Sequence, residues 1–330
     1  MRRRITINTD VILGLTVFSL FSILSLTELK KFEAWPQVTI LWDSGLPLLQ
    51  FIDHFHFERY LVSYIGLMLE DAYSNIGFTI YISLFVATNT LLFRRIHKGF
   101  IGHPPSLGAY TIFLLAHLAM NGRGPIGWCG WLLCLSLHAR YMDTARNGPF
   151  LTITNGVRMV LSVLLSSVSS GVFIVVFAAN ALLTVQVLLA AKHGRRLNFS
   201  HLISISLASF AIGYGFYRAT LYLLDALHKI LLYFGSYSEV IIHGVGIIAQ
   251  RFDPSITLFA LATMTTGFLI LWAAVRKKVP TVLWRLFVIS MIGGAFGFTT
   301  MTLIIPIFLI FISVISRNIS LRPKRRVHTV

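Results

Sequence analysis

Apolar runs long enough to cross a bilayer recur along the whole 330-residue chain. A membrane-spanning helix needs roughly 20 mostly apolar residues, and a segment within the hydrocarbon must satisfy its own backbone hydrogen bonds. Runs of about this length occupy 11–27, 76–93, 105–121, 124–139, 150–167, 171–191, 200–217, 256–275, 280–296 and 298–316. The shorter run at 57–69 predicts a re-entrant or interfacial helix. We therefore expect one all-α domain over residues 1–330, a polytopic integral membrane protein with about 10–12 transmembrane helices.

The composition agrees with this expectation. Apolar residues make up 56% of the chain and charged residues only 12%, whereas soluble domains carry about 25% charged residues. The net charge of +16 could indicate nucleic-acid binding. However, the basic residues form short clusters between apolar runs, which is typical of membrane topology. We therefore expect no nucleic-acid partner.

The distribution of basic residues predicts an orientation. Placing the N-terminus in the cytoplasm puts 20 of the 28 basic residues on that side, and only Asp10 and Asp143 among the 12 acids. The cytoplasmic set is Arg2, Arg3, Arg4, Arg94, Arg95, Lys98, Arg140, Arg146, Lys192, Arg195, Arg196, Arg276, Lys277, Lys278, Arg285, Arg317, Arg322, Lys324, Arg325 and Arg326. By the positive-inside rule, both termini are cytoplasmic. Met1–Arg4 and the run after it read as a retained first span, because no small-residue cleavage site follows.

Two segments are expected outside the regular spans. Residues 28–56 predict an extracytoplasmic loop. Residues 218–255 mix apolar pieces with charges, and predict either an extracytoplasmic excursion or short membrane-embedded helices.

Candidate chemistry is concentrated on the extracytoplasmic side. The segment 28–71 carries Asp43, Glu58 and Arg59 beside Trp42. Carboxylates can act as general bases on sugar hydroxyls, and Trp rings stack on sugar faces. A solvated loop with interfacial aromatic residues is the alternative. The pair His54 and His56 offers too few ligands to predict a metal site.

Arginines form the second candidate group. Arg123 lies in the tight turn 121–125, where its guanidinium could bind phosphate oxygens or simply anchor the helix end. Arg158 lies inside a predicted span, where an arginine costs at least about 2.5–3.5 kcal/mol and so requires a partner or a wet cavity. Arg218 lies at the outer end of a later span. The serine-rich run 166–170 could contact sugar or phosphate, although close helix packing is the commoner role of such residues.

The order of these features resembles the EpsG-type polysaccharide polymerases, relatives of the O-antigen polymerases, over roughly residues 35–190. The resemblance lies in Asp43 after the first span, the segment Phe57-Glu58-Arg59-Tyr60-Leu61, the long span from Asn75 to Arg95, and the turn 121–128 around Arg123. The chain has Ser44 where the family usually has tyrosine, and Pro125 where a helix-compatible residue is usual.

This resemblance implies an enzyme of the bacterial inner membrane. It would join undecaprenyl-diphosphate-linked repeat units into exopolysaccharide, capsule or O-antigen on the extracytoplasmic side, without a cofactor or metal. Glu58 or Asp43 would act as the catalytic base. The diphosphate and sugar would be bound by Arg123, Arg158, Arg218, Arg59 and Trp42. Its partners would be lipid-linked glycans, membrane lipids and a chain-length regulator.

Three other functions remain open from the sequence. A flippase or transporter of a lipid-linked sugar or another anionic solute would need the same membrane arginines. A membrane acyltransferase would need a histidine, for which His117 and His138 are the candidates. An assembly subunit would tolerate substitution of all the arginines.

Overall fold

The computed structural model describes residues 8–27, 29–147, 150, 152–191, 199–234, 279–294 and 302–320, together with a few isolated positions between 262 and 273. Within these ranges the chain is helical and contains no strand, which confirms the all-α prediction. Most of the predicted span 256–275 lies outside the described residues.

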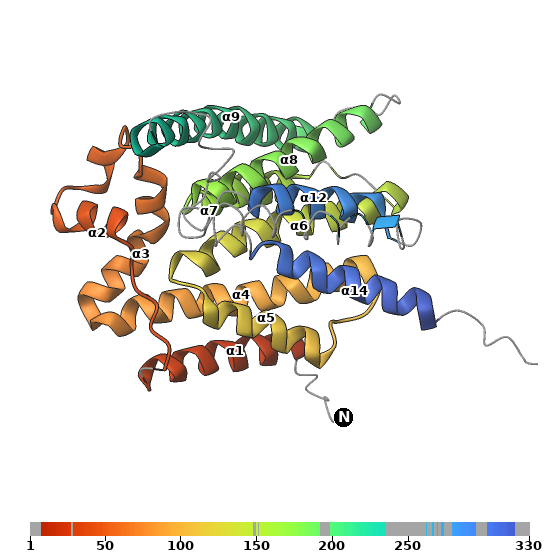
Figure 1. The fold of residues 1–330 in the computed structure, drawn as a ribbon, viewed down its shortest axis with the longest axis horizontal. Coiled ribbons are helices and arrows are strands. Elements are labelled where there is room, and N and C mark those ends of the chain that lie inside the picture. The colour runs from red at the N-terminus through yellow and green to blue at the C-terminus, as the bar shows by residue number, and fades with distance from the viewer. Residues whose placement is uncertain are drawn as a thin grey trace, which may run out of the picture.

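The helices lie side by side and mostly antiparallel, in the order shown in Figure 1. They are α1 (Thr9–Leu26), α2 (Pro36–Asp43), the 3-10 helix η1 (Leu48–Phe51), α3 (Phe57–Tyr73), α4 (Asn75–Ile101), α5 (Leu107–Ala119), α6 (Arg123–Asn147), α7 (Ile153–Ser166), α8 (Ser170–Ala191), α9 (Phe199–Phe234), α12 (Thr281–Gly294) and α14 (Ile304–Ser320). Contacts run from α1 through α4, α6 and α7 to α9, while α2 and α3 lie at one end of the bundle.

Local sequence signals set several helix boundaries. The side chains of Asn8, Ser106 and Thr152 accept hydrogen bonds from backbone N–H groups in the first turns of α1, α5 and α7. Such caps satisfy backbone donors that have no partner inside the helix. Gly102 ends α4 in the left-handed conformation, with φ of 92°, which glycine adopts without steric penalty.

Aromatic side chains hold the middle of the bundle together. Trp128 and Trp131 of α6 are fully buried, and their ring N–H groups donate to Thr302 Oγ1 (2.9 Å) and the Leu303 carbonyl (3.0 Å). These bonds attach the segment leading into α14 to α6. Between α4 and α5, the rings of Phe93 and Phe113 stack with centroids 4.4 Å apart.

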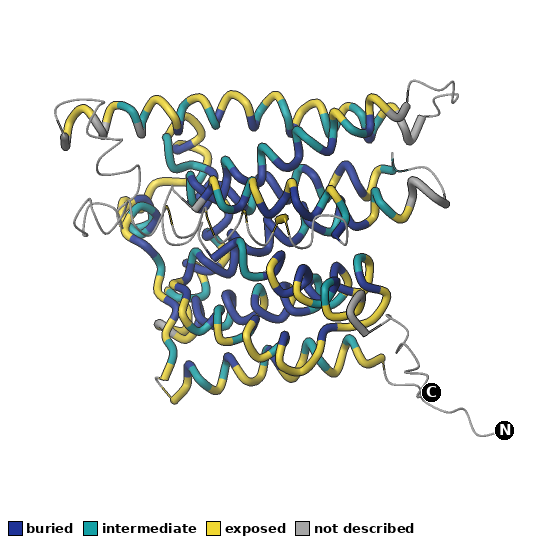
Figure 2. Tube along the Cα trace, turned by 45° about the vertical axis from the view of Figure 1, so that its right-hand side comes forward, coloured by how far each residue is buried: buried dark blue, intermediate teal, exposed yellow. Residues whose placement is uncertain are grey.

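The outer helices expose apolar side chains. Figure 2 shows buried residues in the middle of the stack and exposed ones along α1 and α9. Leu15 is 61% exposed on α1 and Phe210 is 61% exposed on α9. Rows of exposed apolar residues of this kind mark a surface that is covered by lipid or another protein.

Four of the described helices are long and apolar enough to cross a membrane: Thr9–Leu26, Ile76–Ile101, Ser170–Leu189 and Leu202–Asp225. Leu107–Ala119, Ile153–Ser166, Thr281–Gly293 and Ile304–Arg317 are apolar but shorter. Several apolar helices of this kind fit a membrane protein.

The structure refines two expectations for the segments between spans. The expected loop 28–56 contains α2 and η1 and is therefore partly helical. Residues 200–217 and the first part of the expected excursion form one helix, α9, up to Phe234. No glycine or proline occurs between residues 217 and 234, so the polar residues there do not break the helix. Residues 235–255 lie outside the described residues.

The short helix predicted at 57–69 is present as α3, which packs against the beginning of α4. The hydroxyl of Tyr81 donates to the carbonyl of Val62, and a side chain at Gly77 would collide with the backbone carbonyl of Leu69. The close approach of α3 to α4 therefore depends on a position without a Cβ.

We expect Gly77→Ala to lower the free energy of unfolding by about 1–3 kcal/mol, because the added methyl group forces the two helices apart. Thermal unfolding in detergent measures this. Gly108→Ala is the control, because a Cβ there meets open space. Equal stability of the two variants would contradict the close packing of α3 on α4.

Candidate functional site

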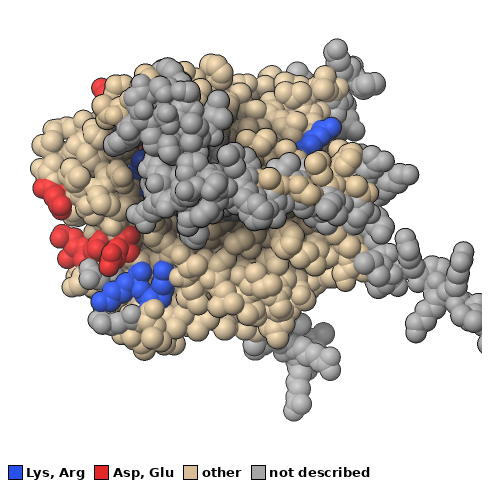
Figure 3. All heavy atoms as spheres, in the orientation of Figure 1, with Lys and Arg blue, Asp and Glu red and all other residues tan. Residues whose placement is uncertain are grey.

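The two ends of the bundle differ in charge. Arg94, Arg95 and Lys98 lie near the end of α4, and Arg317 of α14 reaches the same end, where it donates to the carbonyl of Ile101. The acids of α2 and α3 lie at the opposite end, and Figure 3 shows acidic side chains gathered on that side of the visible face. Most acids of the described residues thus gather at one end, as the sequence predicted, although Figure 3 shows Lys and Arg side chains beside them there.

A buried ion pair joins α3 to α9 at the end where the acids gather. The Arg218 guanidinium contacts Glu58 Oε2 at 2.5 Å, and its Nη2 donates to the Phe55 carbonyl at 2.7 Å. The hydroxyl of Tyr214, one turn earlier on α9, donates to the other oxygen, Glu58 Oε1. Glu58 is 7% exposed and Arg218 is 5% exposed. Each carboxylate oxygen thus has a partner, as a buried charge requires.

Arg59 points from the same turn of α3 toward the connection between α7 and α8. Its Nε donates to the Ser167 carbonyl (3.2 Å) and its Nη2 to Ser170 Oγ (2.7 Å). The ring of Tyr222 lies near both arginines, 5.5 Å from Arg59 Cζ and 5.2 Å from Arg218 Cζ. An aromatic ring attracts guanidinium groups through its negative face, so Tyr222 helps to hold two like charges close together.

Arg123 adds a third guanidinium to this end. It begins α6, is half-buried, and its Nε has no hydrogen-bond partner among the described residues. It lies within electrostatic reach of Arg59. We call Arg59, Arg123, Arg218 and Glu58, with Tyr214 and Tyr222, the arginine cluster. Within it, Glu58 pairs with Arg218, whereas the hydrogen bonds of Arg59 go to uncharged oxygens, so the charge of Arg59 has no acidic partner among the described residues.

Arg158 does not belong to this cluster. It lies within electrostatic reach of Arg140 and Arg95, near the opposite end of the bundle. It precedes Ser166, the last residue of α7, by eight positions, or about 12 Å along the helix. The sequence analysis grouped Arg158 with Arg123 and Arg218, and the structure does not bring it together with them.

Asp43 and Trp42 lie near the cluster in the sequence but are not joined to it by any contact among the described residues. Asp43 is exposed at the end of α2 and makes no hydrogen bond or ion pair there. Trp42 is half-buried, and its ring packs edge-on against Tyr64 at 5.5 Å. Of the seven predicted site residues, the structure brings together Glu58, Arg59, Arg123 and Arg218.

Sequence reasoning missed the tyrosines of the cluster. Tyr214, Arg218 and Tyr222 follow one another at intervals of four, which places them on one face of α9. That spacing could have identified the two tyrosines as neighbours of Arg218. Ser170 belongs to the serine-rich run, for which helix packing was the likelier expectation, and its hydroxyl oxygen accepts a hydrogen bond from Arg59.

The two buried histidines of the acyltransferase alternative have structural partners. His117 Nδ1 lies 2.9 Å from the Phe113 carbonyl, and its Nε2 lies 3.1 Å from Asn89 Nδ2. His138 Nε2 lies 3.1 Å from the Ala179 carbonyl. Both side chains are completely buried, so neither is open to a substrate in this structure.

In the described part of the chain, no group of three His, Cys, Asp or Glu side chains could hold a metal ion. The rings of His54 and His56 lie 5.6 Å apart. Cys129 and Cys134 are free thiols buried in α6.

Comparison with known proteins adds no relative: no family model, no curated protein and no solved structure matches this chain. The fold and the site therefore define a class only. The chain is an all-helical protein with several apolar helices of membrane-spanning character and a buried arginine cluster at one end.

We expect Glu58→Ala to destabilise the protein by about 3–5 kcal/mol, because it leaves the Arg218 charge buried without a counter-charge. The double variant Glu58→Ala, Arg218→Met should recover much of this loss, since no buried charge remains unpaired. Unfolding in detergent gives both values. If the loss of unfolding free energy in the double variant equals the sum of the losses in the two single variants, the two residues do not act as a pair.

Glu70 provides a test based on pH. Burial, and then the nearby charge of Glu33, raise the pKa of the Glu70 carboxyl above its ordinary value. The folded state therefore holds this proton more tightly than the unfolded state does. Folding is favoured below the ordinary pKa of the group, and this contribution is lost as the pH rises through the raised value.

Consequently, Glu70→Gln should raise the unfolding temperature at pH 7 and change it little at pH 4. Asp71→Asn is the control, because the neighbouring Asp71 is exposed. A stabilisation that is equally large at both pH values would rule out relief of a buried charge as its cause.

Proposed function

We propose that this protein is a multi-pass protein of the bacterial inner membrane, with about 10–12 membrane-spanning helices and cytoplasmic termini. One observation supports the membrane location and a second supports the orientation. The described helices expose apolar faces, and the end of the bundle near Arg94, Arg95 and Arg317 carries the basic residues expected in the cytoplasm. The arginine cluster then lies at the extracytoplasmic end.

We propose further that the arginine cluster binds a lipid-linked glycan through its diphosphate, and that the protein joins such units into surface polysaccharide. The observation that carries this proposal is that the buried Arg59 hydrogen-bonds only to uncharged oxygens among the described residues, while Arg218 takes up Glu58 and Arg123 lies within electrostatic reach of Arg59. Buried charge without full compensation is costly, so such a site favours a polyanionic ligand. Guanidinium groups match phosphate oxygens in geometry as well as charge. The resemblance to EpsG-type polymerases suggests the same ligand.

In the proposed reaction, a hydroxyl of the acceptor unit attacks the anomeric carbon of the donor glycan. The new glycosidic bond forms as the bond from that carbon to the diphosphate oxygen breaks. The hydroxyl proton passes to a carboxylate, and the negative charge stays on the departing lipid diphosphate. Arginines near that oxygen would stabilise the charge as it develops.

Glu58 and Asp43 remain the two candidates for the base. In this structure each would need a different rearrangement before it could accept a proton from the substrate. Both oxygens of Glu58 accept hydrogen bonds, from Tyr214 and Arg218. Glu58 could take a proton only after Arg218 turned toward the substrate's phosphate. Asp43 is exposed and needs no such exchange, but it would have to approach the cluster from the end of α2.

A flippase or transporter of a lipid-linked sugar is the second candidate, because an arginine cluster would serve it equally well. A deletion strain distinguishes the two. Loss of a polymerase leaves single repeat units at the cell surface, whereas loss of a flippase leaves them inside the cell.

We expect Arg123→Ala and Arg123→Lys to abolish long-chain polymer while the protein still inserts, because a single ammonium group cannot replace the fork of donors. Gel analysis of surface polysaccharide from complemented deletion cells measures this. Arg285→Ala is the matched control, because Arg285 is exposed on α12 and lies outside the cluster. An unchanged chain-length ladder in both Arg123 variants would refute the assigned role.

A further inference from the structure

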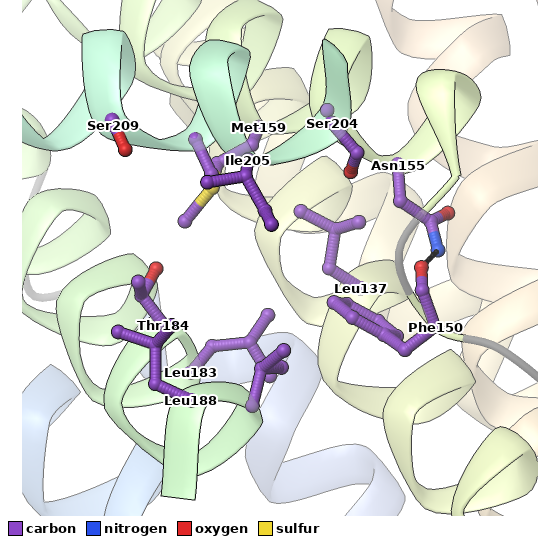
Figure 4. Close-up of a pocket in the computed structure, with 13 residues that line it drawn as sticks. Leu137, Phe150, Asn155, Met159, Leu183, Thr184, Leu188, Ser204, Ile205 and Ser209 are labelled. Atoms are coloured by element: carbon purple, nitrogen blue, oxygen red, sulfur yellow. Dashed lines mark hydrogen bonds between the residues drawn. The ribbon is translucent and has the colours of Figure 1, made fainter. Parts of the chain in front are cut away.

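A second site lies between α6, α7, α8 and α9, near the end opposite the arginine cluster. It is a pocket of about 530 Å³, including its open mouth, and its lining is mostly apolar. Figure 4 shows Leu137, Met159, Leu183 and Ile205 around the space, with Asn155 and Ser204 together at one rim.

The rim carries an unused hydrogen-bond acceptor. Asn155 is 3% exposed, and its Nδ2 donates to the Phe150 carbonyl at 2.6 Å. Its Oδ1 is buried and has no partner among the described residues. Since a buried polar atom is costly to leave unpaired, this oxygen favours a ligand that brings a donor.

Two arginines lie about one helical turn from residues that line the pocket. Arg158 follows Asn155 by three positions on α7, and Arg140 follows Leu137 by three on α6, so each lies about one turn from a lining residue. Arg158 lies within electrostatic reach of Arg140 and Arg95. It forms no hydrogen bond or ion pair in the part of the chain that the structure describes.

Acids offset only part of this charge. Asp10 contacts Arg95 at 3.8 Å and Arg94 at 3.2 Å. Asp143 is exposed on α6, one turn beyond Arg140. Arg158, which pairs with no acid among the described residues, therefore leaves a positive charge one turn from the unpaired acceptor of Asn155.

The pocket becomes apolar away from its rim. Asn155 and Ser204 lie near the starts of α7 and α9, and Met159 and Ala208 lie one turn further along each helix. A lipid in the leaflet on this side has the same order: a charged headgroup at the surface and an acyl chain running inward.

We propose that this pocket binds an anionic phospholipid whose headgroup carries a hydroxyl, of the phosphatidylglycerol type. The acyl chain fills the apolar part, the phosphate lies by Arg158, and a headgroup hydroxyl donates to Asn155 Oδ1. The proposal rests on the membrane location of the chain but not on glycan polymerisation.

Native mass spectrometry of the purified full-length protein tests this with two added probes, phosphatidylglycerol and phosphatidylethanolamine. We expect phosphatidylglycerol to be retained at least tenfold better. Arg158→Gln should reduce its retention at least tenfold, and Arg158→Lys should largely preserve it. Ala208→Phe should exclude both lipids by filling the groove.

Val157→Phe is the matched control, because Val157 is 43% exposed on the neighbouring surface of α7. It should bind like the unchanged protein. If Ala208→Phe does not fold, the unchanged protein still provides a test, since retention of phosphatidylglycerol should fall at high salt. Equal retention of the two lipids, or of phosphatidylglycerol by Arg158→Gln and the unchanged protein, would overturn the proposal.

Discussion

The buried ion pair between Glu58 and Arg218 is the contact on which the end of the bundle around α3 depends. α9 packs along α7 and α8, and its connection to α3 is made by long side chains, with Arg218 and Tyr214 reaching Glu58. Two consecutive residues of α3 thus face in two directions, Glu58 toward α9 and Arg59 toward the α7–α8 connection. Because a buried charge needs a partner, this one turn of α3 fixes how the helices meet at that end.

The same arrangement explains why an anion is the expected ligand. Glu58 is paired with Arg218, whereas Arg59 hydrogen-bonds to uncharged oxygens, and the Tyr222 ring only reduces the repulsion between these two arginines. Low-dielectric surroundings strengthen every one of these interactions. A diphosphate would compensate the excess charge, and it would also compete with Glu58 for Arg218. Binding and release of the Glu58 carboxylate would then be linked events.

The sequence predicted much of the fold, because apolar runs and caps are local signals. The bounds of α7 and α8 agree closely with the apolar runs 150–167 and 171–191, whereas α4 continues past the end of the run 76–93 to Ile101. The gathering of most acids at one end was also predicted from the sequence. The continuation of α9 past Arg218 was not predicted from the sequence, because its polar residues resemble those of a loop until their helical spacing is considered.

The site was only partly predictable for a different reason. Glu58, Arg59, Arg123 and Arg218 stand out as charges near or inside apolar runs, but nothing local shows which of them meet. Arg158 had the same appearance and lies at the other end of the bundle. Tyr214 and Tyr222 each have a partner more than 150 residues away in the sequence. Tyr214 donates a hydrogen bond to Glu58, and the ring of Tyr222 lies beside Arg59. Long-range pairing of this kind is set by helix packing rather than by local pattern.

The most direct test of this account is the binding of undecaprenyl diphosphate to the purified protein in detergent. We expect saturable binding that weakens with salt and falls at least tenfold, or about 1.4 kcal/mol, in Arg59→Gln and in Arg123→Gln. Arg285→Gln should bind like the unchanged protein. Binding that is equally strong in all four proteins would contradict the central claim that the buried arginines form a polyanion site.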